Sequence, residues 1–199
     1  MSALIKMTGT FAWGGRRSGA GRKPGAGKRC VPHRSREPFS RVLPVHVTIR
    51  MAKNVYNLRS QRAFTALKRA FTGAAIRFDT RIVHFSVQGN HIHLIVESPD
   101  EVSLSRAMKG LGVRIARRLN GMMRRTGRVI GDRHHTHVIR SRRAAQHVVR
   151  YVRENHRKHY GVRGMWRIGT TTDEFSSWAY AVALPNPQTA LLRDADRFS

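Results

Sequence analysis

The chain has 199 residues, enough for one ordinary domain with extensions and a substantial hydrophobic core. Its 38 Lys and Arg outnumber 11 Asp and Glu, and the formal net charge of +27 favours a polyanionic partner, most simply nucleic acid. The single cysteine excludes an internal disulfide and a cysteine-built zinc site. An anionic membrane surface is a second candidate partner, but no apolar stretch approaches the length of a membrane span. No signal peptide is recognisable, so we expect a cytoplasmic protein without a membrane segment.

Residues 1–38 are predicted to form a basic arm outside the folded domain. The first 36 residues hold nine Lys or Arg and no acidic residue, and their Gly-rich middle has nothing to bury, so we expect disorder. Such an arm would bind phosphates without reading sequence. A solubilising tail, or a start codon assigned too early, is the alternative. The basic residues at the centre of the arm are Arg16, Arg17, Arg22 and Lys23.

The folded part begins with a predicted strand at 42–51, where apolar and polar residues alternate. A helix is predicted at 59–75, with Ser60 as its candidate N-cap. Its apolar residues stand at helical spacing, so one side of this helix should face the core. They are Phe64, Leu67, Ala70 and Phe71.

A hairpin lies at the centre of the pattern, with strands at 76–87 and 91–97 around the turn-forming pair Gly89-Asn90. Because side chains alternate along a strand, His91 and His93 share one face while the apolar residues between and after them face the core. Two imidazoles side by side can ligate one divalent metal. The alternative is an amphipathic strand with a solvated histidine face, and on the strand alone this alternative is favoured.

Three further elements complete the predicted fold. A long helix at 103–125 is apolar on one side and arginine-rich on the other, and 128–139 is a strand pattern broken near Gly131-Asp132. Ser141 then caps a helix that runs to about residue 159. The order β-α-β-β-α-β predicts an α+β, ferredoxin-like antiparallel sheet of four strands, with two helices on one face and an added C-terminal helix. The other face of the sheet would remain free for a ligand.

The last helix carries a polar stripe in which His147, Tyr151, Asn155 and His159 follow one another at four-residue spacing. Taken alone, Tyr151 is by default a half-buried aromatic at the core edge. A tyrosine hydroxyl titrates near about 10 and is a poor nucleophile unless a metal polarises its target phosphate. Asn155 could add an oxygen ligand to the two histidines, a set that suits Mg²⁺ or Mn²⁺.

Together these motifs resemble the HUH single-tyrosine transposases, and most closely the REP-associated tyrosine transposases of bacteria. The resemblance spans residues 43–161 and depends on the histidine strand, on Gly-Asp-Arg-His-His-Thr-His-Val at 131–138 and on Tyr-Val-Arg-Glu-Asn at 151–155. Relatives usually have proline after the asparagine of the tyrosine helix, whereas this chain has His156. The helix can therefore continue, which makes Tyr160 a second, weaker candidate for the nucleophile.

The resemblance implies a metal-dependent transposase and endonuclease that acts on single-stranded DNA beside hairpins. His91, His93 and Asn155 would hold Mg²⁺ or Mn²⁺, and Tyr151 would attack the phosphodiester, giving a 5′-phosphotyrosine and a free 3′-hydroxyl. The covalent link lets strands be rejoined without ATP or any small-molecule cofactor. The protein would be nucleoid-associated, as a monomer or a dimer. DNA contacts are expected from the arm and from Arg106, Lys109, Arg114, Arg117 and Arg118 of the long helix.

Residues 39–163 would be the catalytic domain, and residues 164–199 an extension that packs on it. Four aromatic residues support packing, and an aromatic platform for unpaired bases is the alternative. These residues are Trp166, Phe175, Trp178 and Tyr180. Two other functions stay open: a non-catalytic module that binds hairpin DNA or RNA, and a domesticated transposase that has lost cleavage. The histidines at 134, 135 and 137 lack cysteine partners, and we expect them to contact phosphate or solvent rather than a second metal.

Overall fold

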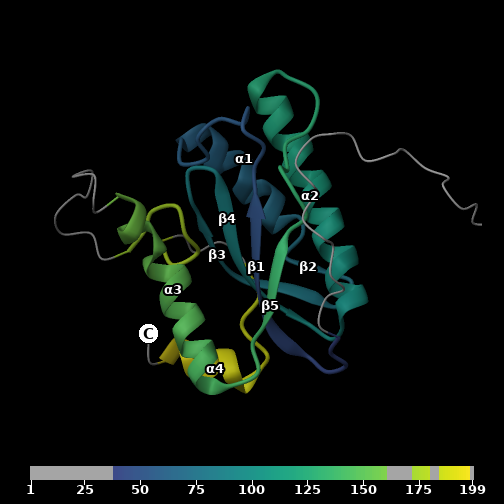
Figure 1. Ribbon diagram of the computed structural model, residues 1–199, viewed down its shortest axis with the longest axis vertical. Coiled ribbons are helices and arrows are strands. Elements are labelled where there is room, and N and C mark those ends of the chain that lie inside the picture. The colour runs from purple at the N-terminus through teal and green to yellow at the C-terminus, as the bar shows by residue number, and fades with distance from the viewer. Residues whose placement is uncertain (1–37, 161–171, 180–183, 198–199) are drawn as a thin grey trace, which may run out of the picture. The chain divides into compact units, whose positions relative to one another are not determined.

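The structure, a computed structural model, describes residues 38–160, 172–179 and 184–197, all within one compact unit (Figure 1). The predictions for the basic arm, including Arg16, Arg17, Arg22 and Lys23, lie outside the described residues. The same holds for Trp166, Tyr180 and the side chain of Tyr160. No helix in the described ranges is both long and apolar enough to cross a membrane.

An antiparallel sheet of five strands forms the centre of the unit, in the order β2-β3-β4-β1-β5. The strands are β1 (Leu43–Arg50), β2 (Ile76–Arg77), β3 (Thr80–Val87), β4 (His91–Ser98) and β5 (His135–Val138). Strand β4 pairs with β1 on one side and β3 on the other, so β1 and β3 run parallel with β4 inserted between them. The predicted ferredoxin-like arrangement is confirmed, with the short β2 as an additional edge strand.

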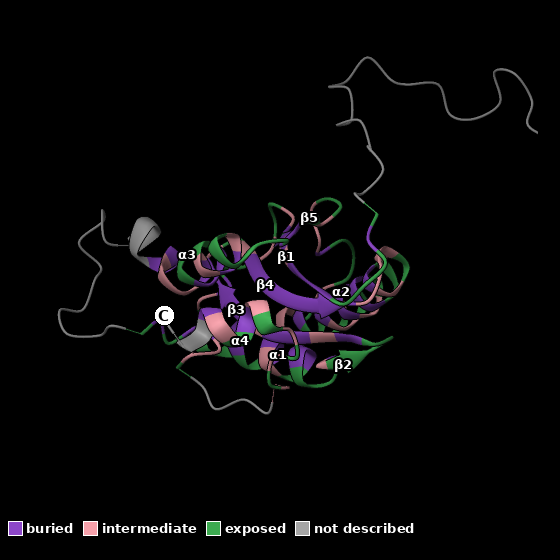
Figure 2. Cartoon of the chain, turned by 90° about the horizontal axis from the view of Figure 1, so that it is seen from below, coloured by how far each residue is buried: buried purple, intermediate pink, exposed green. Residues whose placement is uncertain are grey.

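Helices α1 (Gln61–Thr72) and α2 (Glu101–Met123) cover one face of the sheet. Alternate residues of β1 and β4 point into this core, and β4 is buried along nearly its whole length (Figure 2). Each fully buried aliphatic side chain contributes roughly 1.5–3 kcal/mol to stability. The predicted N-cap of α1 is confirmed, because the Ser60 side chain accepts the Ala63 N–H at 3.3 Å. In the same way Asp100 caps α2 by accepting the Ser103 N–H at 2.7 Å.

The opposite face is not fully free as predicted, because α3 (Arg142–Tyr160) and α4 (Ala190–Arg197) pack on part of it. The two helices lie side by side (Figure 1). Val83 and Ile95 form an apolar patch there, and the apolar stripe of α3 is buried against that patch. Toward the β5 edge of this same face, the side chains of His135 and His137 remain exposed. The face is therefore divided into a covered half and an open, histidine-bearing half.

Two predicted strands are shorter in the structure. The single strand expected at 76–87 is a hairpin, β2 and β3, turned at Phe78 and Asp79 with φ of 51° and 56°. A two-residue hairpin turn of this kind needs two positive φ angles, which Phe rarely adopts, so no turn signal was visible. The strand expected at 128–139 is reduced to β5 plus a bridge from Ile130 to Met51. Residues 131–134 leave the sheet between these two pairings.

Residues 172–179 run along the outer edge of β3, where the Val87 N–H donates to the Phe175 carbonyl at 2.9 Å and the Ser177 N–H to the Phe85 carbonyl at 3.0 Å. The ring of Phe175 enters the core beside α1. Trp178 stacks on His84, with ring centroids 4.5 Å apart. These contacts cover an edge of β3 that would otherwise present free backbone groups.

Helix α4 is attached to the sheet through the buried carboxylate of Glu97 on β4. That carboxylate accepts the Gln188 N–H at 2.8 Å, the Thr189 N–H at 2.7 Å and the Thr189 hydroxyl at 2.6 Å. A buried carboxylate needs such donors, because an unpaired buried charge is costly. Glu97 therefore fixes the start of α4 against β4.

Candidate active site

The open half of the face carries histidines from three neighbouring strands. His91 and His93 of β4 point to this side because the residues between them face the α1–α2 core. Across β1, Thr48 pairs with His93 and Arg50 with His91. Paired residues in a sheet share a face, so the alternation predicted for the histidine strand is confirmed and extended to its neighbours.

The side chains of His91 and His93 converge, with their Nε2 atoms 3.1 Å apart and their rings perpendicular. Two nitrogens bound to one cation at about 2.1 Å and at a right angle would lie about 3 Å apart. The pair therefore has the spacing of two ligands of one metal ion.

Hydrogen bonds at the far side of each ring favour this arrangement. His91 Nδ1 lies 2.8 Å from the amide oxygen of Asn90, and His93 Nδ1 lies 3.0 Å from His46 Nε2 and 3.2 Å from the Thr48 hydroxyl. If each Nδ1 carries the proton and donates it, both Nε2 atoms keep lone pairs that point toward a shared ligand. This is the usual second layer of a histidine metal site.

His46 suits the role of acceptor for His93. Burial, with smaller contributions from the neighbouring His137 and His135, lowers the pKa of His46 from its usual value of about 6.5 to about 4. His46 is then neutral at pH 7, and its Nε2 can accept the proton of His93 Nδ1. From the sequence, His46 could only be placed on the first strand, because the neighbour of a strand is set by long-range pairing.

Tyr151 reaches the site from α3. Its ring centroid lies 5.4 Å from that of His93 and 5.9 Å from that of His46, and both contacts are edge-on. Its ring also packs against the α3–α4 core, as expected for a half-buried aromatic. The core position and the approach to the histidines are therefore both present.

Asn155 lies one turn beyond Tyr151 and is 2% exposed. Its side-chain Nδ2 has no hydrogen-bond partner among the residues that the structure describes. A buried amide without a partner is unfavourable, and the oxygen and nitrogen of such an amide can exchange places by a flip. Asn155 can therefore turn its oxygen toward a ligand. Within the described ranges no three His, Cys, Asp or Glu side chains form a metal-binding group.

The residue after Asn155 has a structural role. Helix α3 continues through it, and His156 is buried with its Nδ1 3.1 Å from the Arg153 carbonyl and 3.9 Å from Asp173. Asp173 in turn accepts two hydrogen bonds from the Arg59 guanidinium, at 2.8 and 2.9 Å. A proline at this position could not make the contact to Asp173, so His156 connects α3 to residues 172–179.

The arginine-rich side of α2 does not face the histidines, because α2 packs on the opposite face of the sheet. Four of the five predicted DNA-contact residues of α2 are exposed, and the fifth, Arg114, is half-buried. The guanidinium of Arg114 lies near the end of α1, because a Cβ on Gly73 would be 3.2 Å from Arg114 Nη1. On the histidine face, the exposed Arg50 stands opposite His91. Arg50 was not identified from the sequence, although its alternation with His46 and Thr48 could have indicated it. The four exposed residues of α2 mentioned above are Arg106, Lys109, Arg117 and Arg118.

Comparisons with known proteins give the family and the fold of the chain. Residues 41–155, more than half of the chain, match the family described as Transposase IS200 like. The fold is similar to that of a REP-associated tyrosine transposase bound to a REP hairpin, with a TM-score of 0.51 and 16% identity over 78% of this chain and 99% of that chain. It is also similar to a candidate transposase from Deinococcus radiodurans R1, with a TM-score of 0.43 and 16% identity over 64% and 96% of the two chains. A search of curated proteins found no match.

Proposed function

The chain belongs to the family of IS200-like transposases, and from this premise we propose that it cleaves and rejoins single-stranded DNA at hairpin-flanked sites through a 5′-phosphotyrosine on Tyr151. The observation that carries the proposal is the convergence of His91 Nε2 and His93 Nε2 to 3.1 Å beside the ring of Tyr151. A metal-binding pair next to a hydroxyl nucleophile is an arrangement suited to phosphoryl transfer.

The donor set fits a divalent cation. His91 and His93 would hold it through Nε2 and Asn155 through its amide oxygen, with Mg²⁺ or Mn²⁺ as the expected ion. When bound, the ion supplies Lewis-acid polarisation of a non-bridging phosphate oxygen. His46 and Thr48 fix the ring of His93, and Arg50 can contact a phosphate beside His91.

In the proposed reaction the Tyr151 oxygen attacks phosphorus and forms a phosphodiester bond to the protein. The bond from phosphorus to the 3′-oxygen breaks with its electron pair, the phenolic proton is lost, and the 3′-oxygen takes up a proton to leave as a hydroxyl. The number of phosphodiester bonds does not change, so a second 3′-hydroxyl can reverse the step with no energy source.

Hairpin DNA is the proposed partner. The net charge of +27 favours a phosphate backbone, and one protein of the same fold is bound to a REP hairpin. A protein that binds hairpins in chromosomal DNA would be nucleoid-associated, which is part of the proposal. Binding should weaken steeply as salt is raised, because each phosphate contact releases counterions.

A cleavage assay on denaturing gels tests the proposal. Labelled single-stranded hairpin DNA from the flanks of the gene is incubated with wild type or Tyr151→Phe, with Mg²⁺, Mn²⁺ or chelator. We expect a protease-sensitive covalent adduct that needs metal and is absent in Tyr151→Phe. An adduct that survives in Tyr151→Phe but not in Tyr160→Phe would move the nucleophile to Tyr160. Tight hairpin binding without any adduct would instead establish the non-catalytic binding module.

A further inference from the structure

Two buried polar side chains next to the histidine pair have no role in the proposed chemistry. Ser86 of β3 pairs with His93 of β4, and the N–H of Gln88, just after β3, donates to the His91 carbonyl at 2.9 Å. Residues that stand opposite one another in a sheet share a face, so Ser86 and Gln88 flank the two histidines on the side away from β1. Ser86 is 0% exposed and Gln88 is 1% exposed.

Only one end of the Gln88 amide is hydrogen-bonded. Gln88 Nε2 donates to Ser86 Oγ at 2.9 Å. The amide oxygen, Oε1, is buried and has no hydrogen-bond partner among the residues that the structure describes. A buried acceptor without a partner is unfavourable, so this oxygen is available for a donor that arrives when the site is loaded.

Helix α3 brings a second incomplete amide to the same face. Asn155 is buried, and its Nδ2, a donor, lacks a partner within the described ranges. In that part of the chain one other buried side-chain oxygen lacks a partner, Oδ1 of Asn120, and it belongs to α2 on the opposite face of the sheet. Of the buried oxygens in the described structure, Gln88 Oε1 is therefore the acceptor open to Asn155.

A series of contacts holds this end of α3 close to Gln88. His156 Nδ1 lies 3.9 Å from the carboxylate of Asp173. That carboxylate accepts a hydrogen bond from Arg59 at 2.9 Å, and the same guanidinium nitrogen donates to the Val87 carbonyl at 3.0 Å. The Val87 carbonyl belongs to the peptide bond that precedes Gln88. The asparagine one position before His156 is thus carried by the part of α3 that is fixed beside this peptide.

Metal binding requires one particular orientation of the Asn155 amide. Mg²⁺ and Mn²⁺ take oxygen ligands, so Asn155 can serve only with its Oδ1 turned toward the histidines. Its Nδ2 then points away from the cation and needs an acceptor. Gln88 offers one, because its own nitrogen is already committed to Ser86. The hydrogen bonds would then run in one direction, from Asn155 to Gln88 and from Gln88 to Ser86.

We propose that Gln88 is a positioning residue for Asn155: Gln88 Oε1 accepts the Nδ2–H of Asn155 and so keeps the Asn155 oxygen directed at the cation. The inference rests on the proposed function, because it takes Asn155 as a metal ligand. Gln88 itself touches neither the cation nor DNA. It does for Asn155, from the β3 side, what His46 does for His93 from the β1 side.

The test measures the Mn²⁺ affinity of the full chain by electron paramagnetic resonance, without DNA, so that no cleavage is needed. Gln88→Met replaces the amide by an apolar side chain of similar length. It should weaken Mn²⁺ binding about tenfold, the size of effect that is typical when a residue supporting a metal ligand is lost. An affinity within twofold of wild type would overturn the proposal.

The same substitution in the Asn155→Asp protein shows whether Gln88 acts through Asn155. A carboxylate has two oxygens that can bind the cation and no N–H that needs an acceptor. Gln88→Met should therefore weaken Mn²⁺ binding less than twofold in this background, against about tenfold in the Asn155 protein. Equal losses in the two backgrounds would overturn the positioning role, because Gln88 would then act independently of Asn155.

Asn120→Leu is the control for a general loosening of the fold. It also removes an amide whose oxygen has no partner among the described residues, together with the 2.9 Å bond from Asn120 Nδ2 to the Gly127 carbonyl, but on the opposite face of the sheet. It should lower the melting temperature and change the Mn²⁺ affinity less than twofold. A loss of Mn²⁺ affinity as large as that of Gln88→Met would overturn the proposal.

The remaining arms separate this inference from the proposed function. Asn155→Ala should weaken Mn²⁺ binding at least as much as Gln88→Met. If Asn155→Ala leaves the affinity unchanged, Asn155 is not a ligand and the inference falls, whereas the role of Tyr151 is still decided by the adduct assay. If the Mn²⁺ affinities follow the expected pattern but wild type forms no adduct with DNA, the positioning role of Gln88 stands and the cleavage proposal falls.

Discussion

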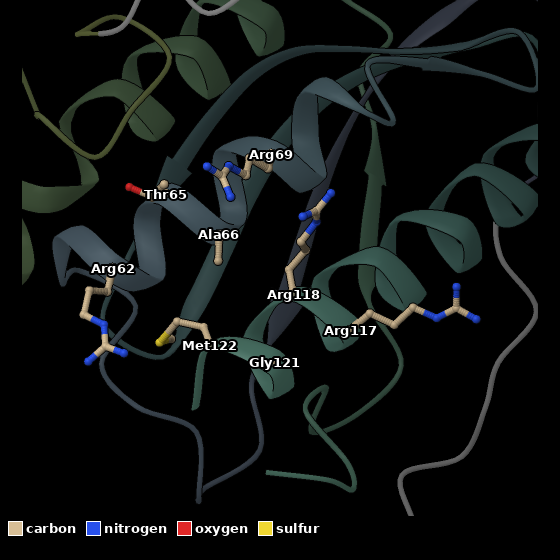
Figure 3. Close-up of a pocket in the computed structure, with 8 residues that line it drawn as sticks. All are labelled: Arg62, Thr65, Ala66, Arg69, Arg117, Arg118, Gly121 and Met122. Atoms are coloured by element: carbon tan, nitrogen blue, oxygen red, sulfur yellow. The ribbon is translucent and has the colours of Figure 1, made fainter. Parts of the chain in front are cut away.

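The two faces of the sheet use basic side chains in different ways. On one face, histidines from β4 and β1 lie within hydrogen-bond distance of each other, and His46 is kept neutral by burial. On the other face, four exposed arginines stand around a groove between α1 and α2 (Figure 3): Arg62, Arg69, Arg117 and Arg118. The close ring nitrogens are suited to a metal, and the separated guanidinium groups to a phosphate backbone. The proposed cleavage and the proposed binding of DNA would then depend on different side chains, which mutation can test one at a time.

Tyr151→Phe gives the largest expected effect. Removing the hydroxyl removes the proposed nucleophile but leaves the ring that packs against the α3–α4 core. We expect adduct formation to fall below detection, with stem-loop affinity within twofold of wild type and an unchanged melting temperature. Gel assays, fluorescence anisotropy and thermal unfolding check the three quantities. A parallel loss of binding would mean that the two faces are not independent.

Arg59→Ala tests the attachment of residues 172–179 to the sheet. Asp173 has a fully buried side chain, and Arg59 is its partner at 2.8 Å, so the variant leaves a buried charge unpaired. We expect the free energy of unfolding to fall by about 3–5 kcal/mol. Urea unfolding measures it, and Arg142→Ala is the matched control. Arg142 pairs with Asp194 at 3.8 Å on an exposed surface, where a loss of about 0–1 kcal/mol is expected. Equal losses would contradict the importance of the buried pair.

His46→Ala tests whether His46 positions the ring of His93 for metal binding. Without His46 the His93 ring loses its 3.0 Å partner, and loss of such a second-layer contact typically costs about 10–100-fold in metal affinity. Mn²⁺ binding, followed by electron paramagnetic resonance, measures the change without any cleavage assay. His137→Ala is the control, because its side chain lies on β5 opposite His46 and is exposed, and we expect a change below threefold. A loss with His137→Ala as large as with His46→Ala would argue against a specific positioning role.

The smallest effect is expected at the N-cap of α2, the helix that carries half of the arginine groove. Hydrogen bonds from Ser103 lower the pKa of Asp100 below its usual value. A carboxylate with a lowered pKa in the folded state stabilises the fold above its unfolded pKa, and the contribution is lost as pH falls through the folded pKa. Asp100→Ser keeps a capping oxygen without the charge. It should therefore lose less stability than wild type as pH is lowered below about 4. Thermal unfolding at pH 3 and pH 7 compares the two proteins, and identical pH dependence would contradict the assignment.

Features of the site set by local periodicity could be predicted from the sequence. Alternation within one strand placed His91 beside His93, and four-residue spacing placed Asn155 one turn from Tyr151. Features set by long-range pairing could not. The register that brings Thr48 opposite His93 joins strands far apart in the chain, and a hydrophobic pattern does not state which strands are neighbours.

The fold shows the same division. The order of helices and strands was sufficient to predict the ferredoxin-like sheet. The turn at Phe78 and Asp79 could not be predicted, because it needs positive φ angles that a phenylalanine rarely adopts. The amphipathic pattern of α2 showed that its arginines face outward. It did not show that they lie on the opposite face of the sheet from Tyr151, because that depends on which face each helix covers.

The pairing of residues 172–179 with β3 has a consequence for kinetics. The helix that carries Tyr151 is joined to its own sheet at both ends: Ser141 caps its start beside β5, and the buried Arg59–Asp173 pair holds the chain shortly after its end. The contacts of Tyr151 with His93 and His46 are then made within a single molecule. Adduct formation at saturating DNA should accordingly be first order in protein, with a rate per molecule that does not change on dilution.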